Sequence, residues 1–175
     1  VQAVAALPSM AACADSEALL AVPPPSDPQM VQRVEQLRGQ LAQVEALEHT
    51  GRFEQGLEQA VKVRRAAEAL GYAPLIAEAS LVEGSLMMAA GRAAEAEQSL
   101  IRAVKLAIVH DLRGIAGEAA AKRIYVLSQG MQRHAEALVT RPVAEALVER
   151  VRDDGRLVAL LHNNLGVAYT QAREF

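Results

Sequence analysis

The sequence predicts an all-α protein, a solenoid of helical hairpins with a period of about 40 residues. A loose turn motif recurs at this spacing, at 51–53, 91–93, 132–134 and 173–175. Such a period indicates units that are too small to bury their apolar faces alone and therefore stack on their neighbours. The composition is 51% hydrophobic but only 3% aromatic, and no segment alternates apolar and polar residues over strand length. Helix is favoured and no sheet is expected.

The expected helices begin and end at recognisable capping residues. Ser26 or Asp27 caps a first helix that has Pro28 in its first turn. Gly51 and Gly91 follow apolar runs and are expected to close helices in the left-handed conformation. The predicted helices cover residues 28–50, 53–70, 74–90, 93–109, 112–129, 133–151 and 156–172.

The chain divides into a terminal segment, a linker and the repeat array. Residues 1–22 are an Ala-rich apolar segment that we expect to be helical, and residues 23–28 are a stiff linker because successive prolines fix φ. The array follows over 29–175, with units at 29–70, 74–110 and 112–151 and a partial unit at 155–175. Since the chain begins at a residue other than Met and stops inside the fourth turn motif, we interpret it as a fragment of a longer protein.

The last predicted helix carries an apolar stripe that its own second helix would normally cover. We expect this stripe to be covered instead by a second copy of the chain, as a homodimer, or by residues 1–22. The stripe is formed by Leu157, Leu160, Leu161, Leu165 and Tyr169.

Small residues recur at equivalent positions when the turns are superposed, which lets antiparallel helices approach closely. The interior position of the first helix falls on Val44, Gly84, Tyr125 and Gly166. The second helix contributes Gly56, Ala96 and Ala137, then Val63, Ala103 and Ala144. With the Leu165-Gly166 pair followed by Tyr169, this pattern resembles the tetratricopeptide repeat. The chain departs from that family in having no Trp, in carrying Val44 and Tyr125 where the family prefers Gly, and in carrying Arg141 where it prefers a large apolar residue. The resemblance implies a right-handed superhelix that binds protein partners.

Two further stretches resemble one particular setting of such repeats. Residues 7–15, from Leu-Pro-Ser to Cys-Ala-Asp, and residues 71–75, Gly-Tyr-Ala-Pro-Leu, look like the segment that joins the kinase portion to the repeats in large bacterial serine/threonine protein kinases of the myxobacterial type. The resemblance implies a signalling context and a docking or sensing module. The chain has no G-x-G-x-x-G, H-R-D or D-F-G motif, so we do not expect the fragment itself to be an enzyme.

Residues with catalytic or metal-binding chemistry are scattered along the chain. Cys13 is the single cysteine, which excludes an intrachain disulfide and favours a reducing cytoplasm. Residues 10–13 are similar to a lipoprotein cleavage box, but no basic residue precedes them and Pro8 interrupts the apolar run. The four histidines, His49, His110, His134 and His162, lie in separate helices or turns. We expect no catalytic residues, no metal and no cofactor.

The first helix of each unit should line the inner surface, according to the tetratricopeptide resemblance. Projecting the groove positions of that family onto this chain gives Arg38, Leu41, Glu45, Glu48, Glu78, Leu81, Ser85, Met88, Lys122, Val126, Gln129, Asn163, Val167 and Thr170. The basic and Asn pairing with which some relatives hold a carboxylate is missing, because Glu45 stands where Asn would be needed. The lining is acidic in its N-terminal half.

The sequence therefore predicts a non-catalytic protein–protein interaction module that docks a peptide or helix in this groove. The alternative is a small-molecule-sensing domain similar to the helical domains of bacterial transcription activators, which a closed apolar pocket with convergent polar groups would favour. The net charge of −3 argues against nucleic acid as a partner. Membrane insertion of this fragment is not expected.

Overall fold

The computed structural model describes residues 25–151 and 154–172, and within these ranges the chain forms helices and turns without a strand. The fold is therefore all-α, as predicted. In chain order the elements are α4 (Pro28–His49), α5 (Phe53–Leu70), α6 (Ala73–Ala89), α7 (Ala93–Val109), α8 (Arg113–Tyr125), the π-helical turn η1 (Val126–Gly130), α9 (His134–Val139), α10 (Arg141–Glu149) and α11 (Gly155–Ala172). The predictions for residues 1–22, Cys13 and the turn motif at 173–175 lie outside the described residues.

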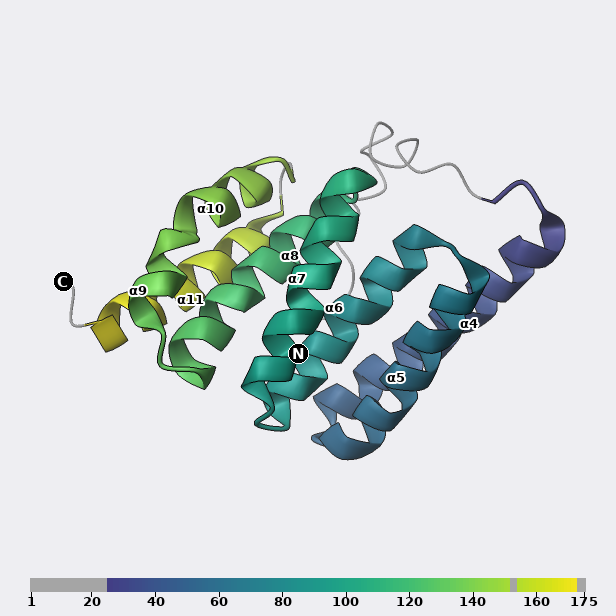
Figure 1. Ribbon diagram of the computed structural model, residues 1–175, viewed down its shortest axis with the longest axis horizontal. Helices are drawn as coiled ribbons and strands as arrows, with labels where there is room; N and C mark the ends of the chain where they lie inside the picture. Colours follow the sequence, from purple (N-terminus) through teal and green to yellow (C-terminus); the bar gives the residue numbers. More distant parts are fainter. Residues whose placement is uncertain (1–24, 152–153, 173–175) are drawn as a thin grey trace.

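The helices pack in the order of the sequence. From α4 to α8 each helix contacts the next, and α4, α6, α8 and α11 also contact one another in succession. Figure 1 shows the resulting row, with α4 and α5 at one end and α9, α10 and α11 at the other. The four helices α4, α6, α8 and α11 thus lie side by side, and we call the surface that they form the first-helix face.

The turns within the first two hairpins close with glycine as predicted. Gly51 has φ 75° and Gly91 has φ 77°. In the first of these turns the Arg52 backbone N–H donates to the Leu47 carbonyl at 2.9 Å and the Gly51 N–H donates to Glu48. The same pair of bonds recurs in the next hairpin at Gly91 and Arg92. This is the Schellman arrangement, which needs a left-handed residue just past the helix.

The third of these turns places Gln132 at the left-handed position, with φ 57°. The helix before it ends in η1, where the Met131 N–H donates to the Val126 carbonyl five residues back, at 3.0 Å. A π-helical turn accommodates one residue more than an α-helical turn. This accounts for the spacing of Gly51, Gly91 and Gln132, in which the second interval is one residue longer than the first.

We predict that Gln132→Gly stabilises the protein. A left-handed conformation costs a residue with a Cβ about 1–2 kcal/mol, whereas glycine adopts it freely. Part of this gain is lost to the greater entropy of glycine in the unfolded chain, so the expected increase in the free energy of unfolding is about 0.5–1 kcal/mol. Urea denaturation measures it. Gln132→Val should destabilise, and a Gly variant that is less stable than the parent would contradict the assigned turn.

The prediction of a single helix over 133–151 is wrong. The helix is divided at Thr140 into α9 and α10, and Pro142 lies in the first turn of α10. Proline has no backbone N–H, so it cannot continue the hydrogen bonding of α9, and its ring crowds the carbonyl four residues earlier. The Thr140 hydroxyl donates to the Ala137 carbonyl at 2.7 Å, which satisfies one of the carbonyl groups at the end of α9.

The small residues of the second helices are buried where the hairpins pack. Ala96, Ala103, Ala137 and Ala144 are each at most 1% exposed. A Cβ on Gly84 would lie 2.9 Å from the side chain of Leu100, which is fully buried. In contrast, Gly166 at the equivalent position of α11 is exposed and has no neighbour within 4 Å of its Cβ direction.

The apolar stripe of α11, which we expected a second copy of the chain or residues 1–22 to cover, packs against other described residues of the chain. Leu157, Leu161 and Leu165 are at most 5% exposed, and they belong to one core cluster with residues of α8, α9 and α10. Leu160 and Tyr169 are partly buried against the same cluster. The stripe is therefore satisfied within the chain, and it no longer supports a homodimer through α11.

Ion pairs join successive helices across the core. The Glu83 carboxylate of α6 is 2% exposed and accepts from Arg64 Nε of α5 at 2.6 Å and from the Ser99 hydroxyl of α7 at 2.8 Å. Glu97 of α7 has a similar role in the following unit, accepting from Arg123 at 2.8 Å and Arg133 at 3.1 Å. These carboxylates connect neighbouring elements, because each accepts hydrogen bonds from donors that other elements supply.

Candidate functional site

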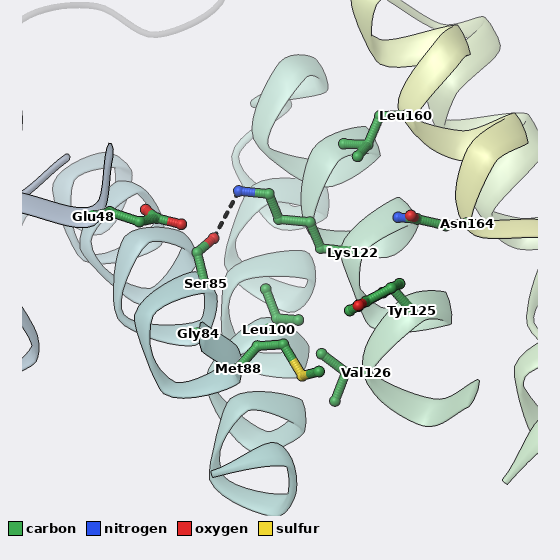
Figure 2. Close-up of a pocket in the computed structure, with 10 residues that line it drawn as sticks. All are labelled: Glu48, Gly84, Ser85, Met88, Leu100, Lys122, Tyr125, Val126, Leu160 and Asn164. Atoms are coloured by element: carbon green, nitrogen blue, oxygen red, sulfur yellow. Dashed lines mark hydrogen bonds between the residues drawn. The ribbon is translucent and has the colours of Figure 1, made fainter. Parts of the chain in front are cut away.

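A pocket of about 200 Å³ opens on the first-helix face. All four of its helices contribute, together with one side chain of α7 and one of η1 (Figure 2). The lining residues are Glu48, Gly84, Ser85, Met88, Leu100, Lys122, Tyr125, Val126, Leu160 and Asn164. The pocket therefore combines an apolar lining with four polar side chains and a tyrosine.

The absence of a side chain at Gly84 helps to form this pocket. Leu100 of α7 packs directly against Gly84, and both residues line the cavity. On the side of α11, Asn164 is 4% exposed and its amide Nδ2 donates to the Ala121 carbonyl at 2.9 Å. Since a buried amide is held by this bond, Asn164 presents a fixed polar group beside Leu160.

Lys122 crosses the pocket from α8 toward α6. Its ammonium donates to the Ser85 hydroxyl at 2.6 Å (Figure 2). The same ammonium lies 3.0 Å from the Glu118 carboxylate. Glu118 also accepts from Arg156 of α11 at 2.9 Å. Burial raises the pKa of Glu118, but the Lys122 and Arg156 cations outweigh burial and hold that pKa below its usual value. The Glu118 carboxylate is therefore charged at neutral pH and joins α8 to α11 through Arg156, while Lys122 joins α8 to α6 through Ser85.

Glu45 and Glu48 lie one turn apart on α4, and neither forms an ion pair or a side-chain hydrogen bond within the described residues. Most other carboxylates of the described helices have a basic partner, for example Glu58 with Lys62 and Glu78 with Arg38. Partial burial, followed by the charges of Glu118 and Glu48, raises the pKa of Glu45, while Lys122 and His49 oppose the shift. The α4 side of the pocket thus carries uncompensated negative charge.

The structure gathers five of the predicted groove residues at the pocket: Glu48, Ser85, Met88, Lys122 and Val126. Arg38 and Glu78 form a salt bridge of 2.6 Å that joins α4 to α6. Leu41 is 5% exposed and belongs to the core. Leu81 and Val167 are partly exposed. Gln129 accepts from Gln171 at 3.3 Å, and the Thr170 hydroxyl donates to its own helix at Gly166.

Some pocket residues were not predicted from the sequence. On α11 the groove position was assigned to Asn163, which is exposed, whereas its neighbour Asn164 lines the pocket. The signal was present, because Asn164 falls on the same helical face as Leu157, Leu161 and Leu165. An amide on an otherwise apolar face is an unusual placement and points to a specific hydrogen bond. Tyr125 and Leu160 were also overlooked as lining residues.

A second pocket of about 320 Å³ lies between α7, α8 and the break that separates α9 from α10. Its lining is mostly apolar and includes the exposed residues Val139 and Val143. Two of its polar groups are already engaged, because Arg123 donates to Glu97 and the Thr140 hydroxyl donates to Ala137. Lys105 also lines it and forms no ion pair among the described residues. The Arg123 Nε atom is buried without an acceptor, out of reach of a ligand. This pocket therefore offers few polar groups to orient a bound molecule.

Comparisons with protein-family models, curated proteins and solved structures gave no match. Among the described residues, His, Cys, Asp and Glu side chains nowhere gather in a group of three that could hold a metal ion. The same residues contain no helix with the length and apolarity needed to cross a membrane.

Proposed function

We propose that this chain is a non-catalytic protein-interaction module, a tetratricopeptide-like right-handed solenoid whose first-helix face binds a peptide or a helix. The observation that supports the proposal is the pocket itself, which joins an apolar lining to polar side chains from α4, α6, α8 and α11. Apolar anchors supply most of the affinity of such sites, and the surrounding polar groups orient the partner.

The size of the pocket favours a protein side chain over a free small molecule. Pockets for drug-sized ligands occupy about 300–1,000 Å³, while a cavity of about 150 Å³ holds one benzene ring. At about 200 Å³ the pocket accommodates a single large apolar side chain. The larger second pocket offers Lys105 as its one polar side chain without a partner among the described residues, not a set of convergent polar groups, so the small-molecule-sensing alternative receives less support from it.

The proposed setting, a docking or sensing region of a bacterial serine/threonine kinase, rests on the sequence resemblance alone, and its placement in the cytoplasm rests on the single cysteine. One of its two stretches has a local explanation in the structure. Gly71 ends α5 with φ 71°, and Pro74 lies in the first turn of α6. These are the residues that a tight turn between two helices favours in any protein.

Peptide selection tests the proposed function. Twelve-residue random peptides displayed on phage are selected on the 175-residue chain, and the synthetic peptides are then titrated by fluorescence anisotropy. Leu160→Gln removes apolar surface from the pocket and should weaken binding at least about tenfold, since burying a Leu-sized group contributes about 1.5–3 kcal/mol.

The matched control is Val158→Gln, which changes an exposed apolar residue on the same helix outside the pocket. It should leave the affinity unchanged, and circular dichroism melting should show that both variants fold. Peptides that bind the two variants equally well would remove the first-helix face as the binding surface.

A further inference from the structure

The charges around the pocket define the chemistry of a partner. Glu45 and Glu48 lie one turn apart on α4, and Glu48 lines the pocket together with Lys122, whose ammonium is 3.0 Å from the Glu118 carboxylate. Two cations, Lys122 and Arg156, are both committed to Glu118. Glu45 and Glu48 are left without a cation of their own in the described structure.

The unpaired carboxylates Glu45 and Glu48 do not stabilise helix α4. Like charges one turn apart on a helix are about 5–6 Å apart at Cβ, and their repulsion destabilises the helix. Elsewhere the chain pairs carboxylates at this spacing with a base, as in Glu58 with Lys62, Arg92 with Glu95 and Arg141 with Glu145. The uncompensated pair lies instead beside the pocket, and Glu48 is one of the lining residues (Figure 2).

Building on the proposed function, we propose that the partner is a basic and apolar polypeptide segment. Its apolar side chain, of the size of Leu, Met or Phe, enters the pocket against Met88, Leu100 and Leu160, and a neighbouring Lys or Arg lies against Glu45 and Glu48. One helical turn spans about 5.4 Å, and an extended chain advances about 3.3 Å per residue. Because Glu48 itself lines the pocket, we expect the basic residue close to the anchor, within about one helical turn or four positions along the partner.

An acidic partner is disfavoured by the same geometry. The Lys122 ammonium already has Ser85 and Glu118 within 3.0 Å, and Arg156 also binds Glu118. An incoming carboxylate would have to displace Glu118 from both cations and would meet Glu45 and Glu48 as like charges. Juxtaposed like charges at an interface cost several kcal/mol and reject a partner.

The selected peptides test this inference when they are compared on two double variants. Glu45→Gln with Glu48→Gln removes both charges and keeps the shape of the side chains. Glu35→Gln with Glu149→Gln is the matched control, because these two carboxylates are exposed, lie outside the pocket and have no ion pair in the described structure. Affinities are measured by fluorescence anisotropy at 50 and 300 mM NaCl, and circular dichroism melting verifies the fold of each variant.

We expect enriched peptides to carry Lys or Arg within four positions of Leu, Ile, Met or Phe. Their affinity should fall at least tenfold on the Glu45/Glu48 double variant and should lose most of its salt dependence, while the control variant binds as the parent does. Enrichment of acidic peptides, or affinities that depend on Leu160 but not on Glu45 and Glu48, would overturn the inference and leave the proposed function standing. Peptides insensitive to Leu160→Gln would overturn both.

Discussion

Arg64→Ala should lower the free energy of unfolding by about 3 kcal/mol, because it leaves a buried carboxylate without its nearest cation. Glu83 is 2% exposed, and Arg64 Nε donates to it at 2.6 Å from the preceding helix. The Ser99 hydroxyl remains at 2.8 Å, but Arg102, at 3.9 Å, is too distant to replace the lost hydrogen bond. Removing one partner of a buried ion pair costs about 3–5 kcal/mol. Because the Ser99 hydroxyl still donates to Glu83, we expect a loss at the lower end of this range. Urea denaturation measures the loss.

Arg65→Ala is the matched control for this prediction. Arg65 is the next residue of α5, is exposed, and forms no ion pair among the described residues. Its removal should change stability by less than about 0.5 kcal/mol. The double variant Arg64→Met with Glu83→Leu should recover most of the loss, because no unpaired charge is left behind. If Arg64→Ala and Arg65→Ala unfold at the same urea concentration, the ion pair between Arg64 and Glu83 does not stabilise the fold, and the prediction is wrong.

The sequence was most informative about the turns and the small residues. Gly51 and Gly91 were recognised because glycine is the residue that adopts a left-handed conformation without strain, and both have positive φ. Ala96 and Ala103 were recognised because close helix packing needs small side chains, and both are fully buried. These features depend on local sequence and on the repeat itself, so a single chain suffices to predict them.

The irregular segments of the third unit were not predicted, for two different reasons. Pro142 is visible in the sequence and has a known effect on helices, so the break between α9 and α10 could have been anticipated. The π-helical turn at 126–130 could not, because it depends on how Val126 and Leu127 are buried between neighbouring helices. The change from α-helical to π-helical hydrogen bonding depends on tertiary packing, and no residue type in the segment predicts it.

The sequence predicted pocket residues that occupy equivalent positions in successive repeats. It did not predict those that depend on contacts between one repeat and the next. Ser85 and Val126 occupy equivalent positions in successive units, and both line the pocket. Asn164 corresponds instead to Arg123 of the unit before, and it faces α8, where its amide meets the Ala121 carbonyl. The hydrogen bond from Lys122 to Ser85 likewise joins α8 to α6, between residues that are 37 positions apart in the sequence. Contacts of this kind require the relative placement of units, which repeat spacing alone does not give.

Gly84→Leu should destabilise the protein by about 1–3 kcal/mol through overpacking between α6 and α7. Even a Cβ at this position would lie 2.9 Å from Cγ and Cδ2 of Leu100 and 3.4 Å from the Ala96 carbonyl oxygen. Leu100 is fully buried and cannot move aside without disturbing its own neighbours. The better helix propensity of Leu, worth about 0.8 kcal/mol, offsets only a fraction of this cost. Thermal and urea denaturation report the change.

The same substitution at Gly166 distinguishes the cost of overpacking from the gain in helix propensity. Gly166 is the equivalent residue of α11, but no atom lies within 4 Å of its Cβ direction. Gly166→Leu should therefore be neutral or stabilising by about 0.5–1 kcal/mol, because it adds helix propensity without a clash. Since Gly84 also lines the pocket, a Leu there should weaken the binding of the selected peptides, whereas Gly166→Leu should not. Equal losses of stability in the two variants would show that the close approach of α6 and α7 at Gly84 does not set the packing of the array.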